Sequence, residues 1–410
     1  MIVTNQYQTV ILGGGMAGMA AAISSARTGE NPILLEKMDQ PGKKILASGN
    51  GRCNLLNLNP PVYYGEPEFA AKVLGPNPVE KLTEFWHSLG LFIRYDNAGR
   101  GYPYTFSSSS VLEALRAELK RLKVQVRTKC RVRDLRFRDG SFQLTAEDGG
   151  CLEAKRIILA TGGAAQPKLG GNLDAWPWLT SAGHTMVSPF PVLTPLITDS
   201  RAISGLSGIR VKCTLRIESR GQVTHEEAGE LLFTDKGISG ICVFQCARFV
   251  TPGESEAVID LAPDLLPGGS LKQELIRRRN ACGDDTPPEL LRGLCLPKLG
   301  YAVCKQSGLS LKGEKACSLS DSTLERIAET VHGYRVRIQA AEGFDRAQLM
   351  AGGVRCSEVR PENMESRLQT GMHITGELLN VDGDTGGFNL MFACMSGILA
   401  GLNGREQTIC

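Results

Sequence analysis

The segment that most constrains the fold is a glycine-rich turn near the N-terminus, between an apolar run and an alanine-rich stretch. Residues 7–12 end in branched apolar side chains, as expected for a strand buried on both faces of a parallel sheet. Gly13, Gly15 and Gly18 follow in the pattern GxGxxG and lead into a predicted helix at residues 16–28. In this pattern the first glycine permits a tight turn, the second admits a pyrophosphate, and the third lets helix and strand pack closely. The segment therefore predicts a dinucleotide-binding turn with an anion at the helix N-terminus.

A second strand completes this unit and ends in an acidic residue. We predict the strand at residues 32–35, and Glu36 follows it directly. A carboxylate at this place in a βαβ unit accepts hydrogen bonds from an adenosine ribose. Because a carboxylate would repel a 2′-phosphate, we expect FAD or NAD rather than NADP. The predicted fold class is α/β, with a Rossmann-like dinucleotide-binding domain.

Three more glycine-rich segments are candidates for lining the same ligand. Residues 41–54 combine glycines, cations and short polar side chains, which suit phosphates and a flavin edge, although the composition alone is equally typical of a surface loop. Residues 160–163 follow an apolar strand at residues 157–159, where an α/β sheet brings backbone next to ligands. A turn at residues 376–390 leads into a small-residue helix expected to reach Leu402, whose N-terminus would stabilise an electron-rich flavin.

Composition and charge exclude several other classes of protein. The 13 cysteines are an odd number without a CxxC pair, so we expect reduced thiols, no disulfide framework and no metal site. A net charge of +3 gives no footprint for nucleic acid. The uncharged stretches at residues 1–26 and 386–404 are interrupted by glycines, which favours buried core over a signal peptide or membrane span. We expect a cytoplasmic protein, and the oligomeric state stays open.

Taken together, these segments resemble one family of bacterial flavoproteins, the BaiN/RdsA family, also described as aminoacetone-oxidase-family FAD-binding proteins. The resemblance covers nearly the whole chain, and several of its motifs are more specific than GxGxxG. In chain order the motifs are GGGMAG, GKKILASGNGRCNL, ATGGAAQPKLGGN, GELLFTDKGISG, AGGVRCSEV with the nearby NMESRL, and GELLNVDGDTGGFNL.

The resemblance implies a two-dinucleotide-binding-domain flavoprotein fold, in which both chain ends build one FAD domain around a β-barrel-like insert and a helical insert. The sequence agrees in outline, because residues 211–217 alternate like a strand whereas residues 271–330 have helical spacing, with Asp321–Ser322 as an expected helix cap. The expected divisions are an FAD-binding first part at 1–192, the barrel-like insert at 193–265, the helical insert at 266–335, return strands of the insert at 336–352, and an FAD-binding second part at 353–410.

The resemblance also carries cofactor contacts over to positions of this sequence. Phosphate and ribose contacts are expected at the N-terminal turn and after the second strand, flavin surroundings at the other glycine segments, and an adenine neighbour at Val132. The full set is Gly13, Gly15, Met16, Ala17, Gly18, Glu36, Lys37, Lys43, Lys44, Ser48, Gly49, Gly51, Arg52, Cys53, Asn54, Val132, Ala160, Thr161, Gly162, Gly376, Glu377, Asp382, Gly386, Gly387, Phe388 and Asn389.

The function that the resemblance favours is FAD-dependent reduction of an activated C=C bond in a small hydrophobic substrate, such as a 3-oxo steroid or bile acid. Such a reaction needs a hydrogen-bond donor to the carbonyl oxygen and a proton source, for which Arg52, Arg100, Tyr102 and Tyr104 are candidates. Without a second strand–GxGxxG–helix unit, any NAD(P)H donor is expected to bind transiently. Two alternatives stay open: an amine oxidase that produces peroxide, and a non-catalytic flavin-containing binding or redox-sensing protein.

Overall fold

The computed structural model describes residues 5–265, 270–281 and 284–405. It divides into two compact units, of which unit 1 comprises Met1–Phe190 with Gln348–Cys410 and unit 2 comprises Pro191–Ala347. The segment 336–352, expected to return within the insert, is shared between them. Its first part lies in a barrel strand of unit 2, whereas Leu349–Val354 forms β18, which pairs with β11 (Met186–Val192). The boundary between the two units within this segment therefore follows the pairing of β18 with β11, which the sequence pattern does not reveal.

Unit 1 is built on a sheet in the order β7-β2-β1-β10-β9-β8, with β19 also paired to β10. The central pairs are parallel, namely β1 with β2, β1 with β10, β2 with β7 and β10 with β19, which confirms the predicted α/β class with a Rossmann-type domain. The strands are β1 (Asn5–Leu12), β2 (Ile33–Leu35), β7 (Gln125–Arg127), β8 (Val132–Arg138), β9 (Ser141–Ala146), β10 (Cys151–Leu159) and β19 (Met372–Ile374).

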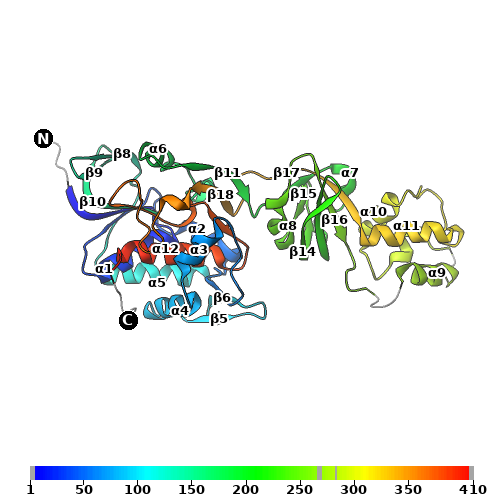
Figure 1. Cartoon of the computed structure of the whole chain (residues 1–410). Helices are drawn as coiled ribbons and strands as arrows, with labels where there is room; N and C mark the ends of the chain where they lie inside the picture. The colour runs from blue at the N-terminus through cyan, green and yellow to red at the C-terminus, as the bar shows by residue number, and fades with distance from the viewer. Residues whose placement is uncertain (1–4, 266–269, 282–283, 406–410) are drawn as a thin grey trace. The chain divides into compact units, whose positions relative to one another are not determined.

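The two ends of the chain share one helical layer against this sheet. Figure 1 shows α1 (Met16–Arg27) beside α12 (Phe388–Leu402), although they come from opposite ends of the sequence. Glycines allow this contact, because a Cβ at Gly397 would collide with the carbonyl oxygen of Ala17. The expected assembly of one domain from both chain ends therefore has its physical basis in close helix packing.

The remaining elements of unit 1 surround this layer. A small antiparallel sheet has the order β3-β6-β5, and β4 pairs with β20. The elements are α2 (Lys43–Ala47), β3 (Leu56–Asn57), β4 (Tyr63–Gly65), α3 (Pro67–Leu74), α4 (Pro78–Ser88), β5 (Ile93–Tyr95), β6 (Arg100–Pro103), α5 (Ser108–Arg121), α6 (Trp176–Ser181) and β20 (Val381–Gly383).

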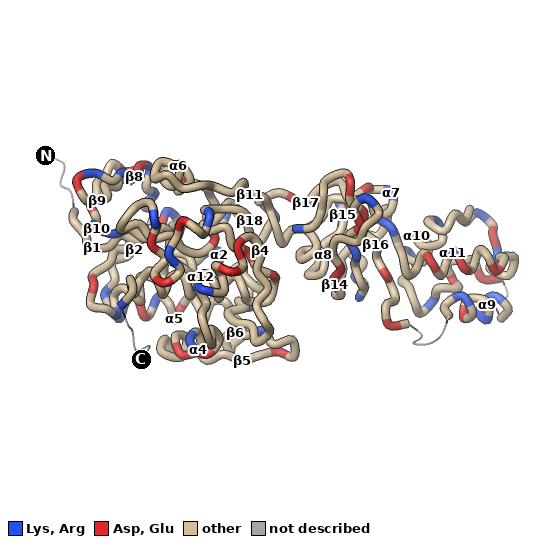
Figure 2. Tube along the Cα trace, viewed as in Figure 1, with Lys and Arg blue, Asp and Glu red and all other residues tan. Residues whose placement is uncertain are grey.

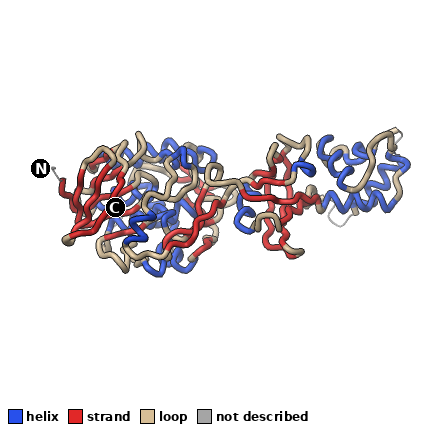
Figure 3. The backbone as a smooth tube through the Cα atoms, turned by 90° about the horizontal axis from the view of Figure 1, so that it is seen from above, coloured by secondary structure: helices blue, strands red, loops and turns tan. Residues whose placement is uncertain are grey.

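Unit 2 contains the expected barrel, which is closed by strands in the order β12-β15-β14-β13-β16-β17, together with helices that follow β16 in sequence (Figure 3). Its strands are β12 (Leu196–Thr198), β13 (Arg210–Ser219), β14 (Gln222–Phe233), β15 (Gly237–Ser239), β16 (Ser255–Asp260) and β17 (Tyr334–Ala341). Its helices are α7 (Ser200–Ile203), α8 (Ile241–Cys246), α9 (Leu271–Ala281), α10 (Pro297–Gln306) and α11 (Asp321–His332).

One local prediction in unit 2 is wrong. The cap of α11 is Ser320, whose side chain accepts a hydrogen bond from the backbone N–H of Thr323, and not Asp321–Ser322, which lie inside the first turn. A cap must have extended backbone while its oxygen reaches back to the helix, and Ser320 has that conformation.

Across the described parts of the chain, no helix is long and apolar enough to cross a membrane.

Candidate cofactor and active site

The N-terminal turn has the conformation that its glycines predict. Strand β1 ends at Leu12, and Gly13 turns with φ +106° while its N–H donates to the carbonyl of Leu35 at 2.8 Å. A Cβ at Gly18 would collide with the carbonyl oxygen of Gly13. Only hydrogen fits there, so α1 starts in close contact with the turn.

Gly15 differs from its neighbours because it faces open space. A Cβ at Gly15 would meet no atom within 4 Å, and Gly15 is the N-cap of α1 without any side-chain cap. The first turn of α1 also contains no acidic residue. A helix N-terminus with free N–H groups and room in front of it suits a phosphate. These residues therefore fit the pyrophosphate of a dinucleotide.

Glu36 lies at the carboxyl end of β2, beside this turn, and is 9% exposed. Its carboxylate accepts hydrogen bonds from the backbone N–H groups of Gly14 and Met38, both at 2.7 Å. These bonds fix the direction of the carboxylate and leave further lone pairs for a ribose. The N–H of Cys130 donates to the carbonyl of Glu36 at 2.9 Å, which brings the segment leading to Val132 alongside the same end of the site.

The cation after Glu36 lies in a partly buried position. Lys37 Nζ is 3.9 Å from Asp174 Oδ2, and Asp174 is held by Arg131 through an ion pair of 2.8 Å. Burial lowers the pKa of Lys37 from its ordinary value, against the attraction of Asp174. The charge at this end of the site is therefore balanced by the protein itself.

The basic glycine segment folds into α2 followed by an unusual left-handed loop. Gly49, Asn50, Gly51 and Cys53 have φ of 56°, 54°, 81° and 59°. Non-glycine residues in this region carry backbone strain, and such strain is concentrated at ligand sites. The thiol of Cys53 is buried, and burial raises its pKa to about 12, so it stays a neutral thiol beside the loop.

Two cations of this segment have protein partners. Lys43 pairs with Asp39 at 2.5 Å, whereas Lys44 reaches across the fold and pairs with Glu377 at 2.7 Å. The other oxygen of Glu377 accepts from the N–H of Met350 at 2.8 Å. The Lys44–Glu377 pair thus joins the N-terminal and C-terminal glycine segments that the sequence placed far apart.

Two buried polar atoms near these loops have no hydrogen-bond partner among the described residues. They are Thr161 Oγ1, just beyond the carboxyl end of β10, and Asn54 Oδ1, after the left-handed loop. Buried polar atoms are nearly always satisfied in a folded protein, by protein, water or ligand. Their position beside glycine turns fits a bound cofactor that would complete their hydrogen bonds.

The C-terminal segment contributes a second helix N-terminus without a side-chain cap. Gly386 and Gly387 have φ of +106° and +120°, and α12 begins after them with no side-chain cap and no acidic residue in its first turn. Asn57 Nδ2 donates to the carbonyl of Gly386 at 3.0 Å. Earlier in this segment the N–H of Gly376 donates to Ser396 Oγ at 3.0 Å, which ties the turn after β19 to the same helix.

Three residues expected to contact the cofactor lie in or beside the turn before α12. The side-chain amide of Asn389 bridges the N–H and carbonyl of Gly383, at 2.7 and 2.8 Å. The ring of Phe388 lies in the core, 5% exposed, and its carbonyl accepts from Tyr63 Oη at 2.7 Å. Asp382 is 2% exposed on β20. These three residues shape the turn before α12, and their contact with a cofactor stays a prediction.

Of the four candidate catalytic residues, Arg100 and Tyr102 lie on β6 and Tyr104 follows it directly, whereas Arg52 lies in the left-handed loop. Arg100 pairs with Asp96 at 2.9 Å, and a Cβ at Gly386 would lie 3.4 Å from its Cδ, so Arg100 lies beside the N-terminus of α12. Tyr102 is buried, at 7% exposure, and Arg52 is exposed in the left-handed loop. Tyr104 is 61% exposed, with the Arg94 guanidinium over its ring. Arg52 thus lies within one glycine loop, and Arg100 lies beside the glycine turn that precedes α12.

Sequence reasoning missed a buried histidine cluster in unit 1. His184 Nδ1 lies 3.0 Å from Glu358 Oε2, and its Nε2 lies 2.8 Å from Ser366 Oγ. Ser366 Oγ also accepts from the N–H groups of Leu368 and Gln369. Burial lowers the pKa of His184 against the pull of Glu358. The cluster ties the segment before β11 to the loop before β19, and the sequence signal was that Glu358 and Ser366 fall in the family-like segments AGGVRCSEV and NMESRL.

Comparison with known proteins agrees with this description. The profile of the family described as HI0933-like protein Rossmann domain matches residues 7–403. The 3-dehydro-bile acid delta(4,6)-reductase of Clostridium scindens is 36% identical over 407 residues, covering 97% of this chain and 98% of that protein. The ribosomal RNA dihydrouridine synthase of Escherichia coli is 28% identical, covering 95% of this chain and 96% of that protein.

A solved structure shows the same fold at lower sequence similarity. An open conformation of a flavocytochrome c3 fumarate reductase matches with a TM-score of 0.52 at 16% identity, covering 98% of this chain and 78% of that one. The chain is a flavin-dependent oxidoreductase with a Rossmann-type FAD-binding domain. With its profile match and its relative at 36% identity, the chain belongs to the HI0933-like family.

Proposed function

We propose that the protein is an FAD-dependent reductase of a C=C bond conjugated to a carbonyl, acting on a hydrophobic 3-oxo steroid or bile-acid-like enone. The observation that carries the proposal is the 36% identity to a 3-dehydro-bile acid delta(4,6)-reductase, which extends over nearly the full length of both chains. Identity of this extent covers all the loops that build the candidate site, not the nucleotide motif alone.

The residues of the candidate site have separable roles in this proposal. The N-termini of α1 and α12 stabilise negative charge on the cofactor, and Glu36 holds the ribose. FAD, when bound, stores the electrons and supplies the hydride. Arg100 is proposed to donate a hydrogen bond to the substrate carbonyl oxygen, because it is a permanent donor beside the α12 N-terminus. Tyr102 and Arg52 remain candidates for the proton source.

We further propose that NAD(P)H reduces the flavin from a transient binding position. The sequence contains only one strand–GxGxxG–helix unit, so a resident nicotinamide domain of that kind is not expected. An electron donor that binds where the substrate later binds would need no nicotinamide domain of its own. The same site would then be used twice in each catalytic cycle.

A second candidate substrate is uridine in RNA. It is favoured by the E. coli relative and by a Haemophilus influenzae ribosomal RNA dihydrouridine synthase, which is 26% identical over 98% of this chain. The chemistry is closely related, because the C5=C6 bond of uracil is also conjugated to a carbonyl. Against RNA stands the net charge of +3, with cationic and anionic residues interspersed along both units (Figure 2), since RNA affinity depends strongly on positive charge.

The deciding experiment is anaerobic visible spectroscopy of the purified FAD-bound protein. We expect NADH or NADPH to bleach the flavin, and a 3-oxo-Δ4 or 3-oxo-Δ4,6 steroid to restore its colour much faster than uridine-containing ribosomal RNA. The reverse preference would establish the RNA substrate. Bleaching by aminoacetone with peroxide release in air would establish the amine oxidase instead. A flavin that none of these compounds reduces or reoxidises would leave the non-catalytic alternative.

A further inference from the structure

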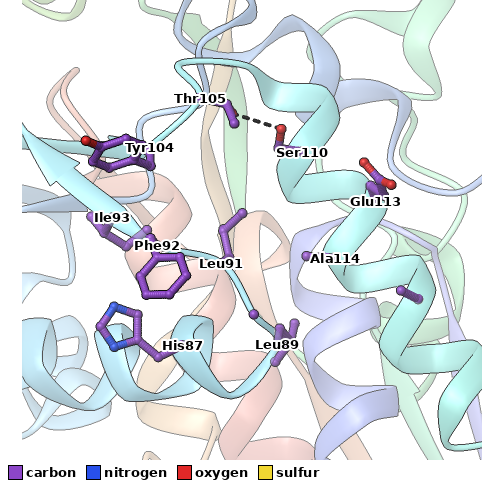
Figure 4. Close-up of a pocket in the computed structure, with 12 residues that line it drawn as sticks. His87, Leu89, Leu91, Phe92, Ile93, Tyr104, Thr105, Ser110, Glu113 and Ala114 are labelled. Carbon is purple, nitrogen blue, oxygen red and sulfur yellow. Dashed lines mark hydrogen bonds between the residues drawn. The ribbon is translucent and has the colours of Figure 1, made fainter.

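Unit 1 carries a surface hollow of ≈ 780 Å³ that the candidate cofactor site does not use. Figure 4 shows it between α5 and a wall formed by the end of α4, strand β5 and the start of the β6–α5 connection. The opposite face of α5 packs Leu112 against Gly42, the N-cap of α2. The hollow and the basic glycine segment therefore lie on different sides of one helix. The lining residues are His87, Leu89, Gly90, Leu91, Phe92, Ile93, Tyr104, Thr105, Ser110, Glu113, Ala114 and Ala117.

One wall of the hollow is aromatic. Figure 4 shows Tyr104, Phe92 and His87 in succession along it, with 5.5 Å between the ring centroids of His87 and Phe92. Phe92 is 67% exposed and Tyr104 is 61% exposed, so two large rings remain in water side by side. The N–H of Tyr104 donates to the carbonyl of Phe92 at 2.8 Å, which fixes the backbone between them. A fixed cluster of exposed rings is typical of a binding surface.

The base and the opposite wall carry apolar and hydroxyl side chains and one charged side chain, Glu113. Leu91 is buried. On the α5 side, Ala114 and Ala117 present only methyl groups to the hollow. Thr105 and Ser110 satisfy each other through a hydrogen bond of 2.8 Å. Glu113 makes no hydrogen bond or ion pair with any residue that the structure describes. No Lys or Arg is among the described residues that line the hollow, although the Arg94 guanidinium lies over the Tyr104 ring at 4.4 Å. Glu113 is the one carboxylate among these described lining residues, on the wall opposite the rings.

We propose that the hollow binds a small molecule with a flat apolar body and a single ammonium group. The volume lies in the range of about 300–1,000 Å³ that is usual for ligand pockets. Aromatic faces attract cations, and Glu113 supplies a counter-charge at the rim. An anionic compound would meet the repulsion of Glu113. The hollow lies on the other side of α5 from the basic glycine segment, and the proposal does not rest on the proposed function.

The test is calorimetric titration of the FAD-bound protein with three matched probes: 2-(2-naphthyl)ethylamine, 2-(2-naphthyl)ethanol and 2-naphthylacetate. We expect the amine to bind about threefold or more tightly than the alcohol, and the acid to bind weakest. Glu113→Gln should remove the difference between amine and alcohol while leaving the alcohol's affinity unchanged. Glu84→Gln removes the same charge from the exposed surface of neighbouring α4, outside the lining, and should change nothing.

A further variant tests the shape of the hollow. Ala117→Leu adds bulk at an exposed helical position and should weaken binding of all three probes without lowering the melting temperature. The proposal is overturned if no probe binds at millimolar concentration, if the acid binds as tightly as the amine, or if Glu84→Gln has the effect expected of Glu113→Gln. Flavin reduction and reoxidation, measured on the same samples, should be unchanged in every variant. Loss of that activity would concern the proposed function and not this site.

Discussion

The N-terminal and C-terminal ends of helices α1 and α12 have opposite electrostatic surroundings. At their N-termini no side chain caps the backbone, and no acidic residue lies in the first turn. At the other end, Arg156 donates to the carbonyl of Ala400 in α12 at 2.7 Å and pairs with Glu30 at 2.5 Å. The helix dipole favours an anion at the first end and a cation at the second. Arg156 therefore supplies a cation at the C-terminal end of α12, whereas no acidic side chain in the first turn of either helix supplies an anion at the N-terminal end.

The difference extends to hydrogen bonding. Glu30 is almost fully buried, and it accepts from Thr9 and Ser25, both at 2.8 Å, in addition to Arg156. By contrast, Thr161 Oγ1 has no partner among the described residues. Saturated polar groups at one end of the helices hold the fold, whereas an unsatisfied one at the other end lies in the proposed cofactor site.

Breaking the saturated end should have the largest effect. Arg156→Met leaves the buried Glu30 with only the half-exposed Arg405, 3.3 Å from its other oxygen, as a counter-charge. We expect the free energy of unfolding to fall by about 3 kcal/mol. Urea denaturation of the variant measures this loss. The matched control is Glu30→Gln combined with Arg156→Met, which removes both charges and should recover most of the stability. A double variant as unstable as the single one would contradict the reasoning.

Filling the open end should leave the fold intact and weaken cofactor binding. Gly15→Ala places a methyl group where no protein atom lies within 4 Å, so the melting temperature of the apoprotein should not change. Affinity for FAD, measured by fluorescence titration, should fall by about 10- to 100-fold because the methyl group meets the phosphate. Gly18→Ala is the comparison, since its Cβ collides with backbone and should destabilise the apoprotein. Equal stability of the two variants would be evidence against this geometry.

The saturated end also predicts a dependence of stability on pH. His373 on β19 donates from Nδ1 to the carbonyl of Asn363 at 2.8 Å, and burial together with the charge of Arg156 lowers its pKa to about 4. Between this pKa and the ordinary value of about 6.5, only the unfolded chain binds the proton, so stability falls as pH falls.

From pH 7 to pH 5, His373 should therefore contribute a loss of about 2 kcal/mol in the free energy of unfolding. His373→Asn keeps a donor at the position of Nδ1 but does not titrate. Urea denaturation at a series of pH values should show a flatter profile for this variant than for the parent chain. Parallel profiles would mean that His373 does not carry this dependence.

The smallest effect is expected for a single unsatisfied atom. Thr161→Val removes the partnerless hydroxyl while keeping the shape of the side chain, so the apoprotein should be as stable as before, or slightly more so. If a cofactor completes that hydrogen bond, FAD affinity should fall about fivefold. Fluorescence titration measures the affinity and thermal unfolding measures the stability. Unchanged FAD affinity would remove Thr161 from the binding site.

Much of unit 1 follows from short sequence patterns. The turn from β1 into α1 could be predicted because Gly13, Gly15 and Gly18 act within a few residues of one another, and the terminus of α12 was expected at Leu402, where it lies. The cap of α11 was misplaced by one residue, because Ser320, Asp321 and Ser322 are all good capping residues and only backbone conformation distinguishes them.

Other features depend on residues that the sequence separates widely. Arg156 lies in β10 next to Lys155 and near Glu153, so nothing local marked it as a buried charge or identified Glu30 as its partner. Likewise, the pairing of Lys44 with Glu377 needs both chain ends in place. The amide of Asn389 closes the turn at Gly383, a role that the sequence did not indicate, and its contact with a flavin stays a prediction.

By itself the sequence determined the dinucleotide-binding unit, the family and the presence of a barrel and helices in the insert, because each is encoded by residues near one another or by motifs in a fixed order. The tertiary structure alone decided which polar groups are satisfied, which candidate lies beside the glycine loops, and that a hollow with an unpaired Glu113 forms on the far side of α5. These properties depend on which distant side chains meet, and local spacing carries no information about that.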